Sequence, residues 1–157
     1  MGVGDTFGEA FAKAQMGASE VLPTGGTAFI SVRDDDKPLV AGVARDLINL
    51  GFEIVSTVGT AKFIEAAGLK VRRVNKVTEG RPHVVDMIKN DEVTLIINTT
   101  EGRQSIADSY SIRRNALQHK IYCTTTIAAG EAICEALKFG PEKTVRRLQD
   151  LHAGLKA

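Results

Sequence analysis

Side chains that suit an anion follow an apolar run in the first third of the chain. Residues 52–55 are typical of a buried strand, and Ser56-Thr57-Val58-Gly59-Thr60 leads from them into a helical pattern. The first N–H groups of a helix lack backbone partners and carry the positive end of its dipole, so this turn suits a phosphate. Gly59 allows close backbone approach, while Thr57 and Thr60 add hydroxyl donors. A plainer interpretation, in which Thr60 caps the helix and does nothing else, is slightly favoured by these residues alone.

The elements that would position this turn alternate regularly along the chain. Strands are expected at residues 27–32, 52–55, 71–74, 93–99 and 121–126, and helices at 38–50, 61–67, 82–90, 105–118 and 128–137. Five strand–helix alternations favour a parallel sheet with helices on both faces, which is a three-layer α/β/α sandwich with a five-stranded parallel sheet.

In such sheets a ligand binds beyond the carboxyl ends of the strands, near a topological switch point. That rule selects hydroxyl, amide and lysine side chains with few acids among them: Ser31, Lys37, Thr57, Thr60, Asn75, Lys76, Asn98, Thr99, Thr100, Thr124, Thr125 and Thr126. Lysines provide point charges and threonine and asparagine provide neutral donors, so we expect this rim to bind a phosphorylated or carboxylated small molecule. Taken singly, each residue is equally well explained as a helix cap or a solvated charge.

Composition narrows the class of protein. A chain of 157 residues with a net charge of +1 can bury one core and exerts no general attraction on nucleic acid or membranes. It lacks an apolar run of about 20 residues and a signal-peptide layout, so we expect a soluble, cytoplasmic protein. Cys123 and Cys134 lack metal-ligand spacing and are expected to be buried free thiols. Neither a dinucleotide fingerprint nor a Gly-x-x-x-x-Gly-Lys-Ser/Thr loop is present.

Acid–base chemistry at the rim would need a suitably placed carboxylate or histidine. Glu79 and Glu101 are the carboxylate candidates, and His83 is the histidine nearest the rim, although each is also explained as a solvated or helix-capping residue. Arg103 could steer an anion, whereas Arg113 and Arg114 are better explained as a basic helix face that meets solvent or another domain.

The two ends of the chain differ from its centre. Residues 1–26 are predicted to form a short helix and a linker, and Phe7 and Phe11 on one side of that helix require a surface to pack against. The sheet domain is expected over residues 27–140. A terminal helix is expected over residues 141–157, beginning at Pro141.

Several motifs together resemble the carboxyl-terminal end of the carbamoyl-phosphate synthetase large-subunit family. They are residues 7–15 (FGEAFAKAQ), 74–77 (VNKV), 80–83 (GRPH), 96–100 (IINTT) and 105–114 (SIADSYSIRR), and the similarity extends over residues 7–137. The resemblance implies an allosteric domain with the methylglyoxal-synthase-like fold. It also implies that residues 7–15 are the tail of a preceding synthetase domain, so that the chain is a fragment of a larger enzyme.

The resemblance further implies roles for individual residues. It assigns phosphate binding to Lys37, Thr57, Thr60, Lys76, Asn98 and Thr100, and it links Ser31 and Thr126 to effectors, Thr126 on the ornithine side. Position in the sequence adds four further candidate effector contacts, which are Gly59, Asn75, Thr99 and Arg103. Residues 98–104 (NTTEGRQ) lack the Gly-Gly-Asp pattern that carries the catalytic aspartate of methylglyoxal synthase. The resemblance therefore implies regulation without chemistry in this domain.

The same resemblance implies the partners. They are the inhibitor UMP, the activator IMP, ornithine, the remainder of the large subunit, the glutaminase small subunit and further copies in a homo-oligomer. It implies no cofactor or metal in this domain, and ATP with Mg²⁺ or Mn²⁺ in the full enzyme, which makes carbamoyl phosphate for arginine and pyrimidine synthesis. Two alternatives remain open: a standalone lyase acting on a sugar phosphate with Glu101 or His83 as base, and a structural domain that docks subunits.

Overall fold

The parallel sheet expected from the sequence is present in the computed structural model, which describes residues 1–140 and 145–154, except the side chains of residues 102–105 and 108. Within this part of the chain the strands are β1 (Gly26–Ser31), β2 (Phe52–Thr57), β3 (Arg72–Val74), β4 (Leu95–Asn98) and β5 (Tyr122–Thr124). They form one parallel sheet in the order β3-β2-β1-β4-β5. The chain therefore reverses its direction of travel across the sheet between β1 and β4, which defines the topological switch point.

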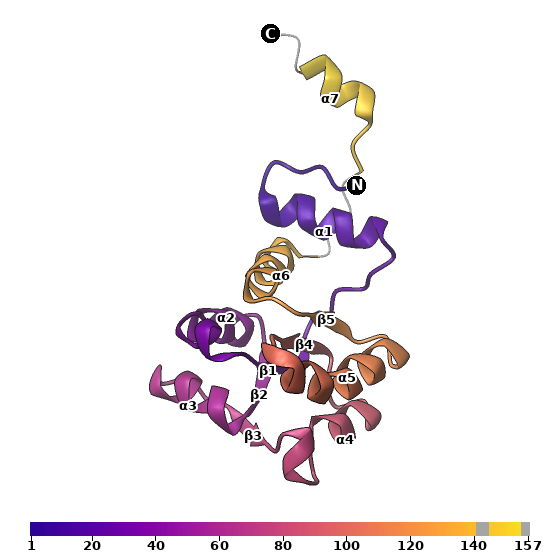
Figure 1. Cartoon of the computed structure of the whole chain (residues 1–157). Coiled ribbons are helices and arrows are strands. Elements are labelled where there is room, and N and C mark those ends of the chain that lie inside the picture. The colour runs from indigo at the N-terminus through magenta and orange to yellow at the C-terminus, as the bar shows by residue number, and fades with distance from the viewer. Residues whose placement is uncertain (141–144, 155–157) are drawn as a thin grey trace.

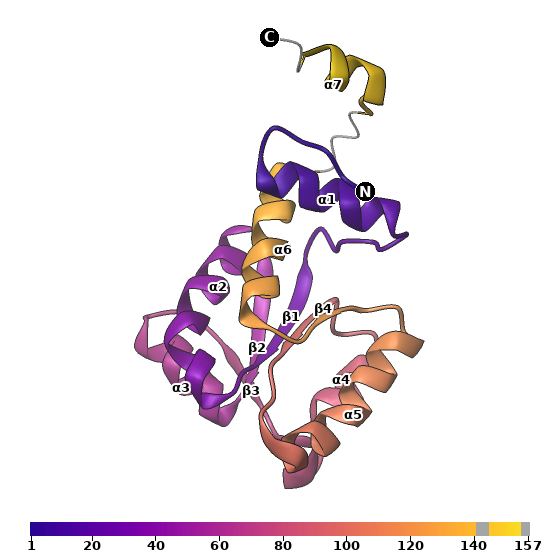
Figure 2. The same ribbon diagram turned by 45° about the horizontal axis from the view of Figure 1, so that its top comes forward.

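Helices cover both faces of this sheet. The helices α2 (Lys37–Asn49), α3 (Val58–Ala66) and α6 (Ile127–Phe139) lie on one face, and α4 (Val84–Lys89) and α5 (Gly102–Gln118) lie on the other (Figures 1 and 2). Short 3₁₀ helices, η1 (Asp34–Asp36) and η2 (Val77–Glu79), precede α2 and α4. The expected three-layer α/β/α sandwich is confirmed.

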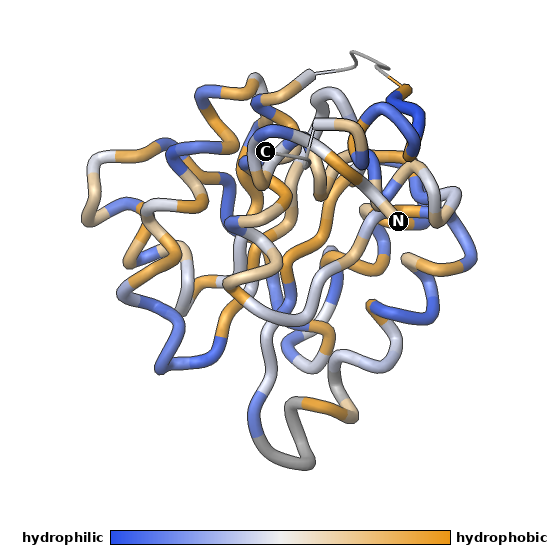
Figure 3. Tube along the Cα trace, turned by 90° about the horizontal axis from the view of Figure 1, so that it is seen from above, coloured by the Kyte–Doolittle hydropathy of each residue, from blue (hydrophilic) through white to orange (hydrophobic). Residues whose placement is uncertain are grey.

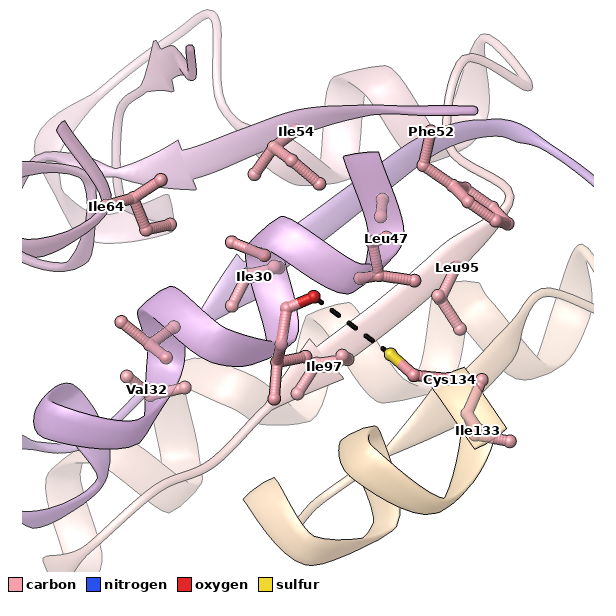
Figure 4. Close-up of a cluster of buried hydrophobic side chains, with 14 of the residues drawn as sticks. Ile30, Val32, Leu47, Phe52, Ile54, Ile64, Leu95, Ile97, Ile133 and Cys134 are labelled. Carbon is pink, nitrogen blue, oxygen red and sulfur yellow. Dashed lines mark hydrogen bonds between the residues drawn. The ribbon is translucent and has the colours of Figure 1, made fainter. Parts of the chain in front are cut away.

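Alternation along the strands divides the core between the two layers. Ile30 and Ile97 point to the face covered by α2, α3 and α6, where Figure 4 shows them among the buried side chains. Their neighbours Phe29 and Ile96 pack on the α4 and α5 side. Viewed from above, apolar residues gather along the central strands and hydrophilic residues lie on the outside (Figure 3). Residues buried on both faces explain the unbroken apolar centre of β4.

The two cysteines differ in burial. Cys134 on α6 is buried, its Sγ lies 4.0 Å from the Val43 carbonyl oxygen (Figure 4), and burial raises the pKa of its thiol to about 12. Cys123 is only partly buried, because β5 is the edge strand of the sheet. Both cysteines are free thiols, as expected. The expectation that both are buried is right for Cys134 and wrong for Cys123.

The first helix, α1 (Phe7–Gly17), packs against α6 of the same chain. Its start is capped by Thr6, whose hydroxyl accepts a hydrogen bond from the Glu9 amide at 3.2 Å. The Phe7 and Phe11 rings stack with centroids 5.6 Å apart, and Phe11 packs on the core. A Cβ added at Gly8 would lie 2.5 Å from the Glu135 carbonyl oxygen, so the two helix backbones are in direct contact. Helix α1 thus packs on α6 of the same chain, but Phe7 is 63% exposed, so the expectation that both rings need a surface to pack against is met by Phe11 alone.

The terminal helix, α7 (Leu148–Gly154), lies beyond α1 and away from the sheet (Figure 1). Pro141, its expected start, lies outside the described residues. Just before α7, Arg146 donates a 2.8 Å hydrogen bond to Asp5 and lies 3.5 Å from a Glu9 carboxylate oxygen. This ion-pair cluster links the segment before α7 to the start of α1. Among the described residues, no helix is both long and apolar enough to cross a membrane.

Candidate anion-binding site

A cavity of about 440 Å³ opens at the carboxyl ends of β1, β2 and β4. It lies beside the switch point between β1 and β4, where the sheet topology predicts a ligand. Nine of the twelve residues expected at the effector site line it: Ser31, Lys37, Thr57, Gly59, Thr60, Lys76, Asn98, Thr99 and Thr100. Residues distant in sequence are thus brought to one place by the ends of three adjacent strands.

Lys37 places its ammonium group at the beginning of α3. A Cβ added at Gly59, in the first turn of α3, would lie 3.9 Å from the Lys37 Nζ atom. The same Nζ atom lies 5.3 Å from the Phe63 ring centroid and 2.5 Å from the Asp34 Oδ1 atom, and the side chain is only 19% exposed. A half-buried cation next to the positive end of a helix dipole makes this corner of the cavity attractive to an anion.

The start of α3 leaves its first N–H groups without a side-chain cap. Thr57 occupies the N-cap position, but its hydroxyl makes no bond to the helix and instead lies 3.1 Å from the Ser31 hydroxyl. Thr60 is the third helical residue, and its hydroxyl accepts from the Val32 amide at 3.2 Å and donates to the Val32 carbonyl at 3.4 Å. The interpretation of Thr60 as the N-cap is therefore wrong, because extended Thr57 starts the helix one turn earlier.

The end of β4 contributes amide and hydroxyl groups. Asn98 is 3% exposed, and its Nδ2 amide has no hydrogen-bond acceptor among the described residues. The Thr99 hydroxyl accepts from the Arg33 backbone amide at 3.0 Å, and the Thr100 hydroxyl accepts from the Arg113 guanidinium at 3.1 Å. An unpaired buried amide beside the cavity costs free energy, which an oxygen of a bound ligand would recover.

Arg33 and Asp34 also line the cavity, although neither is among the residues expected there. The Arg33 side chain pairs with Asp36 at 3.1 Å and approaches Glu101 to 3.9 Å. Asp34 pairs with Lys37, and the hydrogen bond from that ammonium is the main reason that the pKa of Asp34 lies below its usual value. Two acids, Asp34 and Glu101, are thus at the cavity, and of these only Glu101 was expected there. Arg33 and Asp34 follow β1 directly, so the strand-end rule could have found them.

A family model described as "MGS-like domain" matches residues 40–125, which is more than half of the chain. This chain belongs to the MGS-like domain family. It is 97% identical over 157 residues to the carbamoyl phosphate synthase large chain of Pseudomonas syringae pv. tomato, 95% identical to that of Pseudomonas putida and 85% identical to that of Pseudomonas aeruginosa. Each match covers all of this chain and 15% of the relative, so the chain spans about one seventh of these proteins.

Among solved structures, the MGS-like domain is similar to methylglyoxal synthase from Elizabethkingia anophelis NUHP1, with a TM-score of 0.59 and 17% identity. The similarity covers 72% of this chain and 79% of the other. At this identity it establishes the fold alone, and that fold is the methylglyoxal-synthase-like one expected from the sequence.

The remaining expected residues of the MGS-like domain lie elsewhere in the described part of the chain. Asn75 pairs with His83 in an isolated parallel bridge, and the Thr126 hydroxyl accepts from the Ala129 amide at 3.2 Å. Thr124 is the last residue of the edge strand β5 and Thr125 follows it, on the far side of β4 from β1 and β2. The side chain of Arg103 lies outside the described residues.

The candidate acid–base groups are dispersed in the same way. His83 is the N-cap residue of α4 and does not belong to the described lining of the cavity, while Glu79 accepts from the Lys76 backbone amide at 2.9 Å. Glu101 is at the cavity but exposed. Arg114 is exposed as expected, whereas Arg113 contacts Thr100, so the expectation that it meets only solvent or another domain is wrong. The described residues contain no cluster of three potential metal ligands.

Proposed function

We propose that this MGS-like domain is the regulatory part of a carbamoyl phosphate synthase large chain and that its cavity binds nucleoside monophosphates. In this proposal UMP inhibits and IMP activates a full enzyme that makes carbamoyl phosphate from bicarbonate, glutamine-derived ammonia and ATP. The names of the relatives support the proposal, because their identity to this chain reaches 97% over its whole length. The chain corresponds to 15% of such a relative, which leaves room for separate catalytic domains.

The observation that carries the proposal is the position of Lys37 at the uncapped start of α3. The ammonium group and the free helical N–H groups face the same corner of the cavity. A phosphate group can accept hydrogen bonds from both, and each bond to a charged partner contributes about 1.5–3 kcal/mol. Lys76 and the Asn98 amide would complete the phosphate site, with Thr57, Thr60 and Thr100 around it.

A lyase acting on a sugar phosphate is the second candidate, because Glu101 lies at the cavity and the fold is shared with a methylglyoxal synthase. General-base catalysis would require this carboxylate to accept a proton from the substrate. Glu101 is 63% exposed and lies 3.9 Å from the Arg33 guanidinium, so it is open to solvent and already has an ionic partner. The geometry therefore supports binding better than proton abstraction.

Ornithine, the remaining part of the large chain, the glutaminase subunit and further copies belong to the same proposal as partners. Residues 1–26 would connect to the preceding domain, residues 27–140 would form the effector-binding unit and residues 141–157 a terminal helix. A ligand that binds two arrangements of the full enzyme with different affinity would shift their populations, and no chemistry in this domain is then required.

Thermal unfolding of this chain with UMP, IMP, ornithine and inorganic phosphate tests the proposal. A ligand at 100 times its Kd adds about 2.7 kcal/mol to the free energy of unfolding, which is readily measured for a domain of this size. We expect UMP or IMP to raise the midpoint more than phosphate does. Methylglyoxal production from dihydroxyacetone phosphate by this chain would instead establish the lyase.

A further inference from the structure

The half-buried cation of the cavity already has an acidic partner within the chain. The Lys37 Nζ atom lies 2.5 Å from the Asp34 Oδ1 atom. The Asp34 side chain is 90% exposed, whereas the Lys37 side chain is 19% exposed. The Asp34 carboxylate, on the solvent side, therefore already pairs with the ammonium group that a phosphate in this cavity would contact.

We propose that Asp34 is an internal competitor of the phosphate and thereby sets the affinity of the cavity for its effector. This inference rests on the proposed function, since it assumes that an anion binds at Lys37. In the unliganded domain the Asp34 carboxylate pairs with the ammonium group. A phosphate that binds at the start of α3 takes over this ammonium group, and Asp34 turns into solvent.

The exposure of Asp34 makes this exchange inexpensive. An ion pair whose carboxylate is exposed to solvent is weak, so a phosphate that also bonds the α3 amides can displace that carboxylate. Asp34 remains charged at neutral pH, because the hydrogen bond from Lys37 lowers its pKa, and the more distant Lys76 acts in the same direction. The competitor is consequently present wherever the effector would bind.

The run of three aspartates in η1 supplies a matched control. Asp35 is exposed and adjacent to Asp34, while Asp36 is buried and bonds the Arg33 guanidinium. Replacing Asp34 or Asp35 by asparagine removes the same charge from the same short helix. Of the two changes, only D34N removes the observed partner of Lys37.

Two small probes separate competition from simple repulsion between charges. At pH 8 monomethyl phosphate is a dianion, since its second pKa is about 6, and dimethyl phosphate is a monoanion. Loss of a competitor raises the affinity for both probes by the same factor. Loss of a repelling charge raises the affinity for the dianion by a larger factor than the affinity for the monoanion. The factor for the dianion is about the square of the factor for the monoanion, because Coulomb energy scales with ligand charge.

The experiment is a titration of this chain, as wild type, D34N and D35N, with UMP and with both probes at fixed ionic strength. The amide signal of Gly59 in nuclear magnetic resonance spectra reports binding. We expect D34N to bind every ligand about two- to fivefold more tightly than D35N does, with equal factors for the two methyl phosphates.

The outcomes separate the two proposals. Equal affinities of D34N and D35N, with UMP bound by the wild type, would overturn the competitor alone. A gain that grows with ligand charge would also overturn it, in favour of repulsion. Absence of binding of UMP and of both methyl phosphates in all three proteins would overturn both the competitor and the proposed function, whereas binding by D34N alone supports both.

Discussion

Two helices of this domain, α3 and α6, begin in the same way in sequence but differently in structure. Each follows a strand of the sheet, and each has an extended threonine at its N-cap, Thr57 for α3 and Thr126 for α6. The Thr126 hydroxyl accepts a hydrogen bond from the third helical amide. The Thr57 hydroxyl turns instead to Ser31, and the Lys37 ammonium lies at the start of that helix. Direction of the hydroxyl, and not residue type, distinguishes a capped helix from a candidate ligand site.

The strongest test of this difference is the substitution Lys37→Ala. We expect the affinity for UMP to fall by about 1.5–3 kcal/mol, because a charged hydrogen bond in a partly desolvated site is lost. Calorimetric titration measures the change. Lys70→Ala is the matched control, since Lys70 is exposed and lies beyond the carboxyl end of α3, away from the cavity. Equal affinities of the two variants would remove Lys37 from the site.

The substitution Thr126→Ala tests the other helix. Removal of a hydroxyl N-cap should lower the free energy of unfolding by about 1 kcal/mol. Urea denaturation measures this loss, and the affinity for inorganic phosphate should stay unchanged, because Thr126 lies away from the cavity. A weaker phosphate affinity with unaltered stability would reverse the roles assigned to the two helix starts.

Thr57→Val keeps the branched shape of the side chain and removes only the hydroxyl. Because that hydroxyl does not cap α3, we expect a smaller loss of stability than for Thr126→Ala, about 0.5 kcal/mol. UMP affinity should fall about fivefold, as expected for the loss of one weak hydrogen bond of about 1 kcal/mol from this hydroxyl to the phosphate. Denaturation and ligand titration of both threonine variants measure these effects. Equal changes in unfolding free energy and in affinity for the two variants would contradict the difference between the two helix starts.

The smallest expected effect belongs to Gly59→Ala. Alanine favours a helix over glycine, and its Cβ would meet Lys37 only at an ordinary contact distance of 3.9 Å, so stability should rise by about 0.5 kcal/mol. The added methyl group also narrows the approach to the first amides of α3, and UMP should bind slightly more weakly. A thermal midpoint that rises without ligand and responds less to UMP would show both effects. Gly42→Ala, with open space around its Cβ position in α2, controls for helix propensity alone.

The sequence predicts residue positions best at the carboxyl ends of the strands. The β-branched and apolar runs gave the strands, and alternation of strand and helix gave the parallel sheet. Ser31, Thr57 and Asn98 could then be placed at one edge, because carboxyl ends of parallel strands coincide. The cavity lining follows from that topology with little further information.

Contacts between side chains of different elements were not predictable in the same way. Whether the hydroxyl of Thr57 or Thr60 caps α3 depends on the neighbouring segment of the chain, where Ser31 at the end of β1 and Val32 just after it provide competing hydrogen-bond partners. The pairing of Asp34 with Lys37 requires the turn that η1 makes between β1 and α2. These features depend on backbone direction at helix starts, where local sequence patterns carry the least information.

Two glycines, Gly130 on α6 and Gly8 on α1, bring α6 into close contact with β4 and with α1. A Cβ at Gly130 would lie 3.0 Å from Ile97, the residue before Asn98, and a Cβ at Gly8 would meet the backbone of α6 at Glu135. At Gly8 the backbones of α1 and α6 touch directly, whereas at Gly130 the α6 backbone packs on the side chain of Ile97. Helix α6 is therefore held between β4 and α1 by close contacts at both places. A displacement of the strand end at Asn98 would move α6 as a whole and thereby shift α1, since close-packed contacts leave little free space to absorb it.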